Sequence, residues 1–180
     1  MSIPGELILI TGLIGSGKTT FYSAAIAWAG LRGWQAAGLV SPPVFQNGIK
    51  IGIDVLDVRS GQLRRLANLR LKNGGEITTE RWKFNPEILR WGNQVLAHIL
   101  PCDLLVVDEL GPLEFERGQG WITGLSVLDT RSYRLGLATI RPGLLGRAQE
   151  RWPFANVMKM QSVDEVTEKI AAWLDPLAER

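Results

Sequence analysis

The sequence predicts an α/β fold of three layers, with a mainly parallel central sheet and an antiparallel hairpin insertion at one edge. Two observations support this prediction. Short apolar runs, such as LILIT at 7–11 and LLVV at 104–107, alternate with segments of helical periodicity, as in sheets whose parallel strands are joined by helices. Between about 43 and 70 the pattern changes to alternating strands with turn signals, which is typical of hairpins.

The first half of the chain contains the predicted insertion. A strand over Leu7–Thr11 leads into a helix over Lys18–Gly33, and a short strand over Gln35–Val40 ends at two prolines. The next segment, VFQNGIKIGIDVLDVRSGQLRRLANL, contains an Asn-Gly and a Ser-Gly turn signal and predicts two hairpins or a three-stranded meander. A loop is predicted over 73–84.

The second half returns to alternating helices and strands. Asn85–Leu100 is predicted as a helix, because Asn85 is a good N-cap and proline follows at the first position. The run CDLLVVDE at 102–109 predicts a buried strand. The remaining predicted elements are a helix over Gln119–Asp129, a strand over Tyr133–Thr139, a loop and short helix over Pro142–Arg151, a strand over Ala155–Met160, and a C-terminal helix that follows a capping box of Ser162 and Glu165.

Composition limits the class of protein. The 180 residues are 46% hydrophobic and 21% charged, with a formal net charge of +2, which is ordinary for a soluble globular chain. Cys102 is the only cysteine, which fits a reducing compartment, and no run reaches the roughly 18 apolar residues of a membrane helix. We therefore expect one domain over 1–180, a cytoplasmic monomer without membrane contact. Nucleic acid is only a weak alternative partner at this charge.

A phosphate-binding loop lies between the first strand and the first helix. GLIGSGKT at 12–19 matches the G-x-x-x-x-G-K-[ST] pattern in this setting, where glycines and the helix N-terminus direct backbone N–H groups toward an anion. Lys18 is expected at the β- and γ-phosphates, and the Thr19 hydroxyl at Mg²⁺. The candidate nucleotide-binding residues are Gly12, Leu13, Ile14, Gly15, Ser16, Gly17, Lys18, Thr19 and Thr20.

Two carboxylates end the buried strand at 104–107. Asp108 is the second predicted metal residue, since an aspartate there can hold Mg²⁺ through its waters. Glu109 points to the other side of a strand and is the candidate base that activates water. The run DELG also matches the D-x-x-G of switch GTPases, but the chain has no N-K-x-D segment for guanine, so the glutamate-base hypothesis is favoured.

Basic side chains give weaker signals. Arg141, Arg147 and Arg151 follow the strand at 133–139, where α/β sheets place ligand groups. Arg141, nearest the strand end, is the favoured candidate for a catalytic arginine finger. A second basic group is interpreted as the solvated face of the hairpins, with a basic wall beside the triphosphate as the alternative: Arg59, Arg64, Arg65, Arg70 and Lys72.

On these motifs the chain resembles the THEP-type nucleoside triphosphatases, a small P-loop family. ITGLIGSGKTT is similar to the family's phosphate loop, and the segment at 36–67 to its glycine, proline and hairpin region. LLVVDELGPLE is similar to its acidic strand, where Gly111 and Glu114 match and Pro112 and Leu113 depart. The resemblance implies a RecA-like P-loop NTPase domain that hydrolyses nucleoside 5′-triphosphates with Mg²⁺ and tolerates several bases.

Three functional hypotheses stay open on the sequence. Mg²⁺-dependent hydrolysis of a nucleoside triphosphate is favoured. The alternative is a kinase that uses the same loop on a nucleoside, a nucleotide or a nucleic-acid end, which needs an acceptor pocket and a basic lid such as the 59–72 region. A nucleotide-sensing module without turnover is the third.

Overall fold

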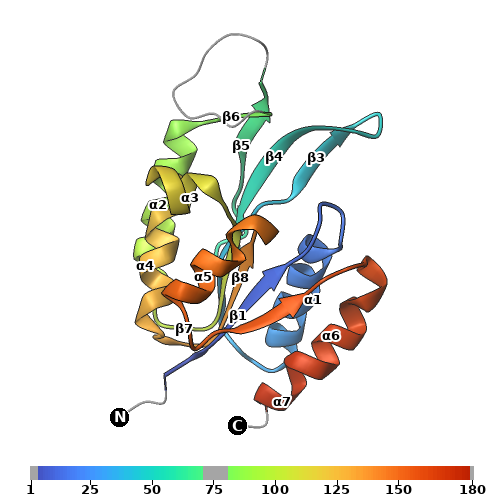
Figure 1. Cartoon of the computed structure of the whole chain (residues 1–180), viewed down its shortest axis with the longest axis vertical. Coiled ribbons are helices and arrows are strands. Elements are labelled where there is room, and N and C mark those ends of the chain that lie inside the picture. Colours follow the sequence, from blue (N-terminus) through green and yellow to red (C-terminus); the bar gives the residue numbers. More distant parts are fainter. Residues whose placement is uncertain (1–3, 71–80, 179–180) are drawn as a thin grey trace.

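A computed structural model of the chain describes residues 4–70 and 81–178. Among these residues nine strands form one sheet, in the order β6-β5-β4-β2-β7-β8-β1-β9, with β3 paired to β4 (Figure 1). The parallel strands of this sheet are β1 (Glu6–Thr11), β2 (Ala36–Val40), β7 (Cys102–Leu110), β8 (Tyr133–Ile140) and β9 (Asn156–Lys159).

The strand order separates the two motifs. Strand β1, which leads into the phosphate loop, pairs with β8 and β9, while the acidic strand β7 pairs with β2 and β8. One strand, β8, therefore lies between them. The carboxyl ends of parallel strands meet at one edge of the sheet, so the phosphate loop and the carboxylates lie at the same edge.

An antiparallel extension continues the sheet beyond β2. It consists of β3 (Pro43–Gln46), β4 (Ile49–Asp57), β5 (Leu63–Leu69) and β6 (Trp82–Phe84). The Asn47-Gly48 turn has φ of 49° and 75°, the left-handed pair that a tight hairpin turn requires. The predicted hairpins are confirmed.

The loop predicted over 73–84 is wrong at its end, because Trp82–Phe84 pairs with β5 as strand β6. Three residues are too few to display strand periodicity, and tertiary pairing alone defines this strand. Residues 71–80 of that prediction lie outside the described residues.

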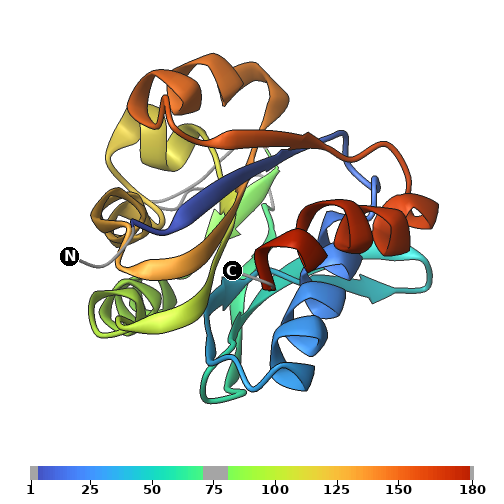
Figure 2. The ribbon, with the colours of Figure 1, turned by 90° about the horizontal axis from the view of Figure 1, so that it is seen from below.

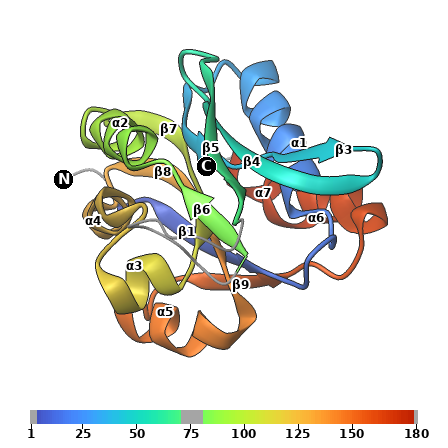
Figure 3. The same ribbon diagram turned by 90° about the horizontal axis from the view of Figure 1, so that it is seen from above.

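Helices cover both faces of the parallel strands (Figures 2 and 3). The helices of one face are α1 (Lys18–Leu31), α6 (Val166–Trp173) and α7 (Asp175–Ala178), and those of the other are α2 (Pro86–Ala97), α3 (Pro112–Arg117), α4 (Ile122–Thr130) and α5 (Leu145–Arg151), which follows a 3₁₀ turn at Pro142–Leu144. Phe21 and Trp28 fill the first interface, and Trp121 and Trp152 fill the second. The three-layer prediction is confirmed.

Three of the predicted helix boundaries are wrong. Helix α1 ends at Leu31 rather than Gly33, whose φ of 70° is left-handed backbone. Helix α2 begins as predicted, with the Asn85 side chain accepting a hydrogen bond from Glu87 N, but it ends at Ala97 rather than Leu100. Pro101 disfavours helical backbone at the residue before it. The helix predicted over 119–129 begins only at Ile122, because Gly118 and Gly120 both have left-handed backbone.

Helix α3 was not predicted, although its signals are present. Gly111 precedes it, Pro112 occupies its first position, and the Glu114 side chain accepts a hydrogen bond from Gly111 N, which is half of a capping box. Gly118 ends it in left-handed backbone. The start signals at Gly111–Glu114 and the stop signal at Gly118 together indicate a helix of six residues.

The C-terminal helix also differs from its prediction. Ser162 Oγ accepts from Asp164 N, and the Glu165 carboxylate accepts from Gln161 N, so the predicted capping box is replaced by a 3₁₀ turn over Val163–Glu165. Helix α6 follows this turn. In the described part of the chain, no helix has the length and apolar character needed to cross a membrane.

Candidate active site

Four strand ends bring the candidate residues together. The phosphate loop follows β1, the acidic pair ends β7, Arg141 follows β8, and Ser41 follows β2. Because these strands are neighbours in the sheet, residues up to 130 positions apart in the chain share one edge. This edge is the position where open α/β sheets bind ligands.

The phosphate loop depends on its glycines for two different reasons. Gly15 and Gly17 have φ of +83° and +87°, backbone that other residues rarely adopt. Gly12 has no room for a side chain, since a Cβ there would lie 2.2 Å from the Met160 carbonyl oxygen. The side chains of Leu13 and Ile14 are 77% and 97% exposed, while Ser16 is buried, so the two apolar residues of the loop do not anchor it in the core.

Lys18 is held by its own loop. Its ammonium donates hydrogen bonds to the carbonyl oxygens of Gly12 (2.9 Å) and Leu13 (2.7 Å) and to Ser16 Oγ (3.2 Å). Partial burial lowers the pKa of Lys18, while the Glu109 and Asp108 carboxylates act in the opposite direction. The charges of both carboxylates therefore act on the lysine that the loop holds.

Asp108 is a buried carboxylate with fixed partners. It accepts a hydrogen bond from Ser41 N at 3.0 Å and another from the Thr139 side chain. The Tyr22 hydroxyl lies 2.6 Å from Thr139 Oγ1. Desolvation, reinforced by the neighbouring Glu109 charge, raises the pKa of Asp108 to about 7.

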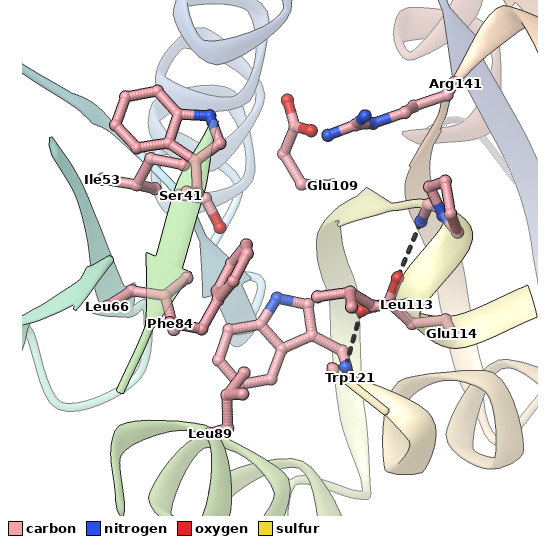
Figure 4. Close-up of a pocket in the computed structure, with 14 residues that line it drawn as sticks. Ser41, Ile53, Leu66, Phe84, Leu89, Glu109, Leu113, Glu114, Trp121 and Arg141 are labelled. Atoms are coloured by element: carbon pink, nitrogen blue, oxygen red, sulfur yellow. Dashed lines mark hydrogen bonds between the residues drawn. The ribbon is translucent and has the colours of Figure 1, made fainter. Parts of the chain in front are cut away.

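Glu109 sits in strained backbone at the end of the same strand. Its φ is +65°, and the pairing of β7 with β8 shifts register between Val107 and Leu110. Such a bulge re-aims a side chain, and strain of this kind is common at functional sites. Glu109 is exposed, and its carboxylate points toward the guanidinium of Arg141 (Figure 4).

Glu114 is a buried carboxylate to which the sequence analysis gave no role. It is 7% exposed and accepts hydrogen bonds from Gly111 N (2.8 Å) and Trp121 N (2.7 Å). Burial raises its pKa to about 7, against the effect of these two donors and of the Arg141 charge. The side chain ties the start of α3 to the start of α4 beside Glu109. The Gly-Pro-x-Glu pattern is the signal that identifies it.

The three candidate arginines occupy different places. Arg147 pairs with Glu116 at 3.4 Å, and Arg151 pairs with Asp129. Both are therefore engaged on the surface of α5. Arg141 instead lines the cavity beside Glu109, with its Nε 3.2 Å from where a Cβ on Gly111 would lie. The structure thus places Arg141 beside the acidic pair, and its role as a finger stays a prediction.

Three of the basic residues of the hairpins have partners within the chain. Arg59 donates to the carbonyl of Pro101 at 3.1 Å, Arg64 stacks 4.3 Å from the Trp91 ring, and Arg65 pairs with Asp54. These contacts are structural, and Lys72 lies outside the described residues.

Lys50, which the sequence analysis did not select, faces the site from β4. It is half-buried, 5.1 Å from the Trp82 ring, and burial lowers its pKa while Glu109 raises it. Its position depends on how the extension curves over the sheet edge, and the sequence holds no local signal of it.

Two cavities flank the site. One, which we call the aromatic pocket, opens beside Glu109 and has Ser41 and Arg141 at its rim (Figure 4). Its apolar walls include Ile53, Leu66, Trp82, Phe84, Leu113 and Trp121. The other cavity, of about 460 Å³, lies beside the phosphate loop, and its lining includes Leu13, Pro142, Leu145, Lys159 and Gln161.

A sequence model of the NTPase family matches residues 7–132, which is well over half of the chain. The chain is 29% identical over 140 residues to the nucleoside-triphosphatase THEP1 of Pyrobaculum islandicum, covering 78% of this chain and 76% of that protein. It is 34% identical over 107 residues to the protein of the same name from Pyrobaculum aerophilum, covering 59% and 58%. It is 32% identical over 120 residues to the nucleoside-triphosphatase THEP1 of Methanothermobacter thermautotrophicus, covering 61% of this chain and 62% of that protein.

Two solved structures share the fold. The solution structure of a human cancer-related nucleoside triphosphatase superposes with a TM-score of 0.73 at 21% identity, covering 94% of this chain and 98% of that one. The crystal structure of THEP1 from Aquifex aeolicus superposes with a TM-score of 0.69 at 16% identity, covering 97% of this chain and 99% of that one. At these identities the likeness concerns the fold alone. The resemblance seen in the sequence is confirmed by the family match: the chain belongs to the NTPase family.

Proposed function

We propose that this protein hydrolyses nucleoside 5′-triphosphates to the diphosphate and phosphate, that the reaction depends on Mg²⁺, and that several bases are accepted. One observation carries the proposal. The phosphate loop after β1 and the acidic pair at the end of β7 lie at one edge of the sheet, with the single strand β8 between them, and the charges of both carboxylates act on Lys18. Phosphate binding and water activation therefore have their groups at one site. The names of the relatives, nucleoside-triphosphatases, agree with this activity.

The phosphates would bind to the loop backbone. The exposed loop and the start of α1 supply N–H groups and a partial positive charge. Lys18 would exchange its carbonyl contacts with Gly12 and Leu13 for oxygens of the β- and γ-phosphates.

The residues present fit a magnesium ion. Thr19 and Asp108 offer a hydroxyl and a carboxylate, the hard oxygen donors that Mg²⁺ prefers. Within the described residues no group of three or more histidine, cysteine, aspartate and glutamate side chains gathers at one place, and Mg²⁺ usually takes one or two carboxylates together with substrate phosphates. When bound, the ion would neutralise charge on the β- and γ-oxygens.

Glu109 would act on the attacking water. Its carboxylate is exposed at the site while that of Asp108 is buried, so the two carboxylates can serve different partners. The water oxygen bonds to the γ-phosphorus, its proton passes to Glu109, and the bond to the β–γ bridging oxygen breaks. Arg141, beside Glu109, would stabilise charge on the transferred group.

The base would lie in the cavity beside the phosphate loop. Leu13, Pro142 and Leu145 offer apolar contact there, which does not distinguish one base from another. We expect phosphate release from ATP, GTP, CTP and UTP at rates within about tenfold of each other, since apolar pockets discriminate weakly. A rate for one base far above the others would contradict this arrangement.

Glu109→Gln tests the proposed chemistry. General base removal should lower turnover by at least about 100-fold, while nucleotide binding by calorimetry stays near that of the unmodified protein. Glu116→Gln is the matched control, because Glu116 lies on α3, is exposed and pairs only with Arg147 of α5 among the ion pairs described. Near-normal turnover in Glu109→Gln would reject Glu109 as the base. Binding without turnover in the unmodified protein would favour a nucleotide sensor.

We further propose a cytoplasmic monomer that does not use nucleic acid. Cys102 is buried and its pKa is raised by burial to about 11, which suits a thiol kept reduced. The hairpin arginines Arg59, Arg64 and Arg65 are engaged within the chain rather than available to a phosphate backbone. Light scattering of the purified protein, with and without a single-stranded oligonucleotide, tests the monomeric state and the absence of nucleic-acid binding.

A further inference from the structure

The aromatic pocket opens beside Glu109, the proposed general base, and hydrolysis as proposed gives it no role. Glu109 and Ser41 both line it, with Arg141 at the rim. The nucleotide is accounted for by the phosphate loop and the cavity beside Pro142. The second substrate of hydrolysis is water, which also needs a place beside Glu109.

The size of the pocket suits water. The enclosed space is about 40 Å³. One buried water needs about 10–15 Å³, so there is room for about three waters. A cavity that holds benzene has about 150 Å³. A nucleoside or a nucleotide, the acceptors that the kinase hypothesis requires, therefore does not fit inside this pocket.

Ser41 brings to the pocket a hydroxyl that needs a partner. The residue is 5% exposed, and its Oγ has no hydrogen-bond partner among the described residues. Buried polar atoms are almost always hydrogen-bonded. Because bulk solvent does not reach this oxygen, its partner must be a molecule enclosed beside it. The Ser41 N–H donates to Asp108 at 3.0 Å, which fixes the residue beside the acidic pair.

Two charged groups border the same space. The Glu109 carboxylate points toward the Arg141 guanidinium at the pocket (Figure 4), yet none of the ion pairs found among residues 4–70 and 81–178 joins them. Polar groups held apart in this way are often bridged by water. Together with Ser41 they offer the polar partners that a buried water requires, about two to four.

Apolar side chains make up most of the remaining lining. Trp82 and Trp121 are 7% and 2% exposed, and both line the pocket together with Phe84. Such walls offer a water few hydrogen bonds, so it is directed to the side of Ser41 and Glu109. Exclusion of bulk solvent also strengthens the electrostatic interactions within a site.

We propose that the aromatic pocket is the binding site of the attacking water, and that Ser41 is a catalytic residue that holds this water together with Glu109. The water donates one hydrogen bond to the Glu109 carboxylate and the other to Ser41 Oγ, so that an oxygen lone pair faces the γ-phosphorus. The Ser41 hydroxyl donates its own hydrogen to a second water of the pocket. This inference rests on the proposed function and adds the site of its second substrate.

The reaction step needs no further reactant. The water oxygen bonds to the γ-phosphorus as the bond to the β–γ bridging oxygen breaks. One water proton passes to Glu109, and the nucleoside diphosphate leaves with the electron pair of the broken bond. Ser41 keeps its own proton, because its hydroxyl only orients the water. Another water of the pocket takes the same position before the next turnover.

A crystal structure of the unmodified protein with Mg²⁺ and a non-hydrolysable triphosphate tests the binding site directly. We expect an ordered water within about 2.6–3.2 Å of both Ser41 Oγ and the Glu109 carboxylate. This water should be missing from Ser41→Val, which offers it no hydroxyl. No ordered water between Ser41 and Glu109 in the unmodified protein overturns the inference.

Two matched pairs of variants test the hydroxyl in catalysis. Ser41→Ala should lower kcat about tenfold, the effect of one hydrogen bond, with KM unchanged because the nucleotide contacts remain. Ser41→Thr retains the hydroxyl and should keep most of kcat, whereas Ser41→Val has nearly the same shape without it and should fall like Ser41→Ala. Ser132→Ala is the control, since Ser132 is exposed just before β8, at the opposite edge of the sheet. Circular dichroism establishes that each variant is folded.

The outcomes separate this inference from the proposed function. Loss of kcat in Ser41→Ala and Ser41→Val, with rescue in Ser41→Thr, supports the water site. Equal kcat in the unmodified protein and Ser41→Ala overturns it and leaves the hydrolase standing. Equal losses in Ser41→Thr and Ser41→Val also overturn it, because the hydroxyl would then be immaterial. No phosphate release by the unmodified protein overturns both.

Discussion

The phosphate loop and the acidic segment from Asp108 to Glu114 form two halves of one site, and they are built differently. The loop is exposed at Leu13 and Ile14 and presents backbone groups. The acidic segment presents side chains, two of which are buried: Asp108 is 2% and Glu114 7% exposed. In the loop, glycine torsions define the geometry. In the acidic segment, hydrogen bonds from distant elements define it.

This difference decides what each half is sensitive to. Backbone N–H groups do not titrate, so the loop depends on conformation and on one charge, that of Lys18. The carboxylates of Asp108 and Glu114 have pKa values raised by burial to about 7, so the acidic segment depends on pH. Substitutions should therefore affect the loop through sterics and the acidic segment through protonation.

The largest expected effect is that of Lys18→Ala. Loss of the charged hydrogen bonds to phosphate should weaken nucleotide binding by at least about 100-fold, measured by calorimetry with a non-hydrolysable triphosphate. Lys169→Ala is the matched control, because Lys169 lies on α6 and pairs only with Glu165 at 3.8 Å among the ion pairs described. Unchanged affinity in Lys18→Ala would mean that the backbone alone holds the phosphates.

Two glycine replacements separate torsion from space within the loop. Gly17→Ala combines a φ of +87° with a Cβ 2.6 Å from Val163 Cα and should cost about 3 kcal/mol of stability. Gly15→Ala has nearly the same torsion but no atom within 4 Å of the new Cβ and should cost about 1–2 kcal/mol. Urea unfolding measures both. Equal losses would mean that the Val163 contact relaxes freely.

The same contrast explains what could be predicted from sequence. The order of strands and helices along the chain and both hairpins follow from local signals such as Asn47-Gly48, and these predictions are confirmed. The role of GLIGSGKT in phosphate binding also follows from a local signal and stays a prediction. The acidic pair was located by its position at a strand end. Its protonation behaviour was not predicted, because it comes from Ser41, Thr139 and the surrounding core, which are distant in sequence.

The features missed by sequence reasoning share a physical cause. Strand β6 exists only through pairing with β5. The charge of Glu109 acts on Lys50 because the antiparallel extension brings β4 near the end of β7. The left-handed backbone of Glu109 contradicts the residue's own preference and is imposed by the bulge in β7. Tertiary context overrides local preference at each of these places.

Glu114→Gln sharpens the pH side of the comparison. The pKa of Glu114 is about 7 in the folded protein against 4.5 ordinarily. Between these values the folded state binds the proton and the unfolded chain has released it, so ionisation opposes folding as pH rises. The contribution of protonated Glu114 to the free energy of unfolding is complete below pH 4.5 and is lost as pH rises through 7. The loss amounts to about 3 kcal/mol.

The measurement compares the free energies of unfolding of the unmodified protein and of Glu114→Gln. Urea unfolding of the unmodified protein and of Glu114→Gln, at steps between pH 4.5 and 8, should give curves that diverge, with the unmodified protein losing stability relative to the variant. Asp108 is present in both proteins, so its own titration cancels. Parallel curves would mean that the hydrogen bonds from Gly111 and Trp121 hold Glu114 ionised in the folded state.

The smallest expected effect concerns the backbone of Glu109. Glycine adopts a φ of +65° without the cost that other residues bear, so Glu109→Gly should be about 0.5–1 kcal/mol more stable than Glu109→Gln. Both variants lack the carboxylate and its repulsion of Asp108, so their difference reports the relief of the torsion less the greater backbone entropy that glycine loses on folding. Both should also lack turnover. If the glutamine variant is as stable as the glycine variant, the left-handed backbone holds no strain, and the bulge in β7 would then serve only to direct the side chain toward Arg141.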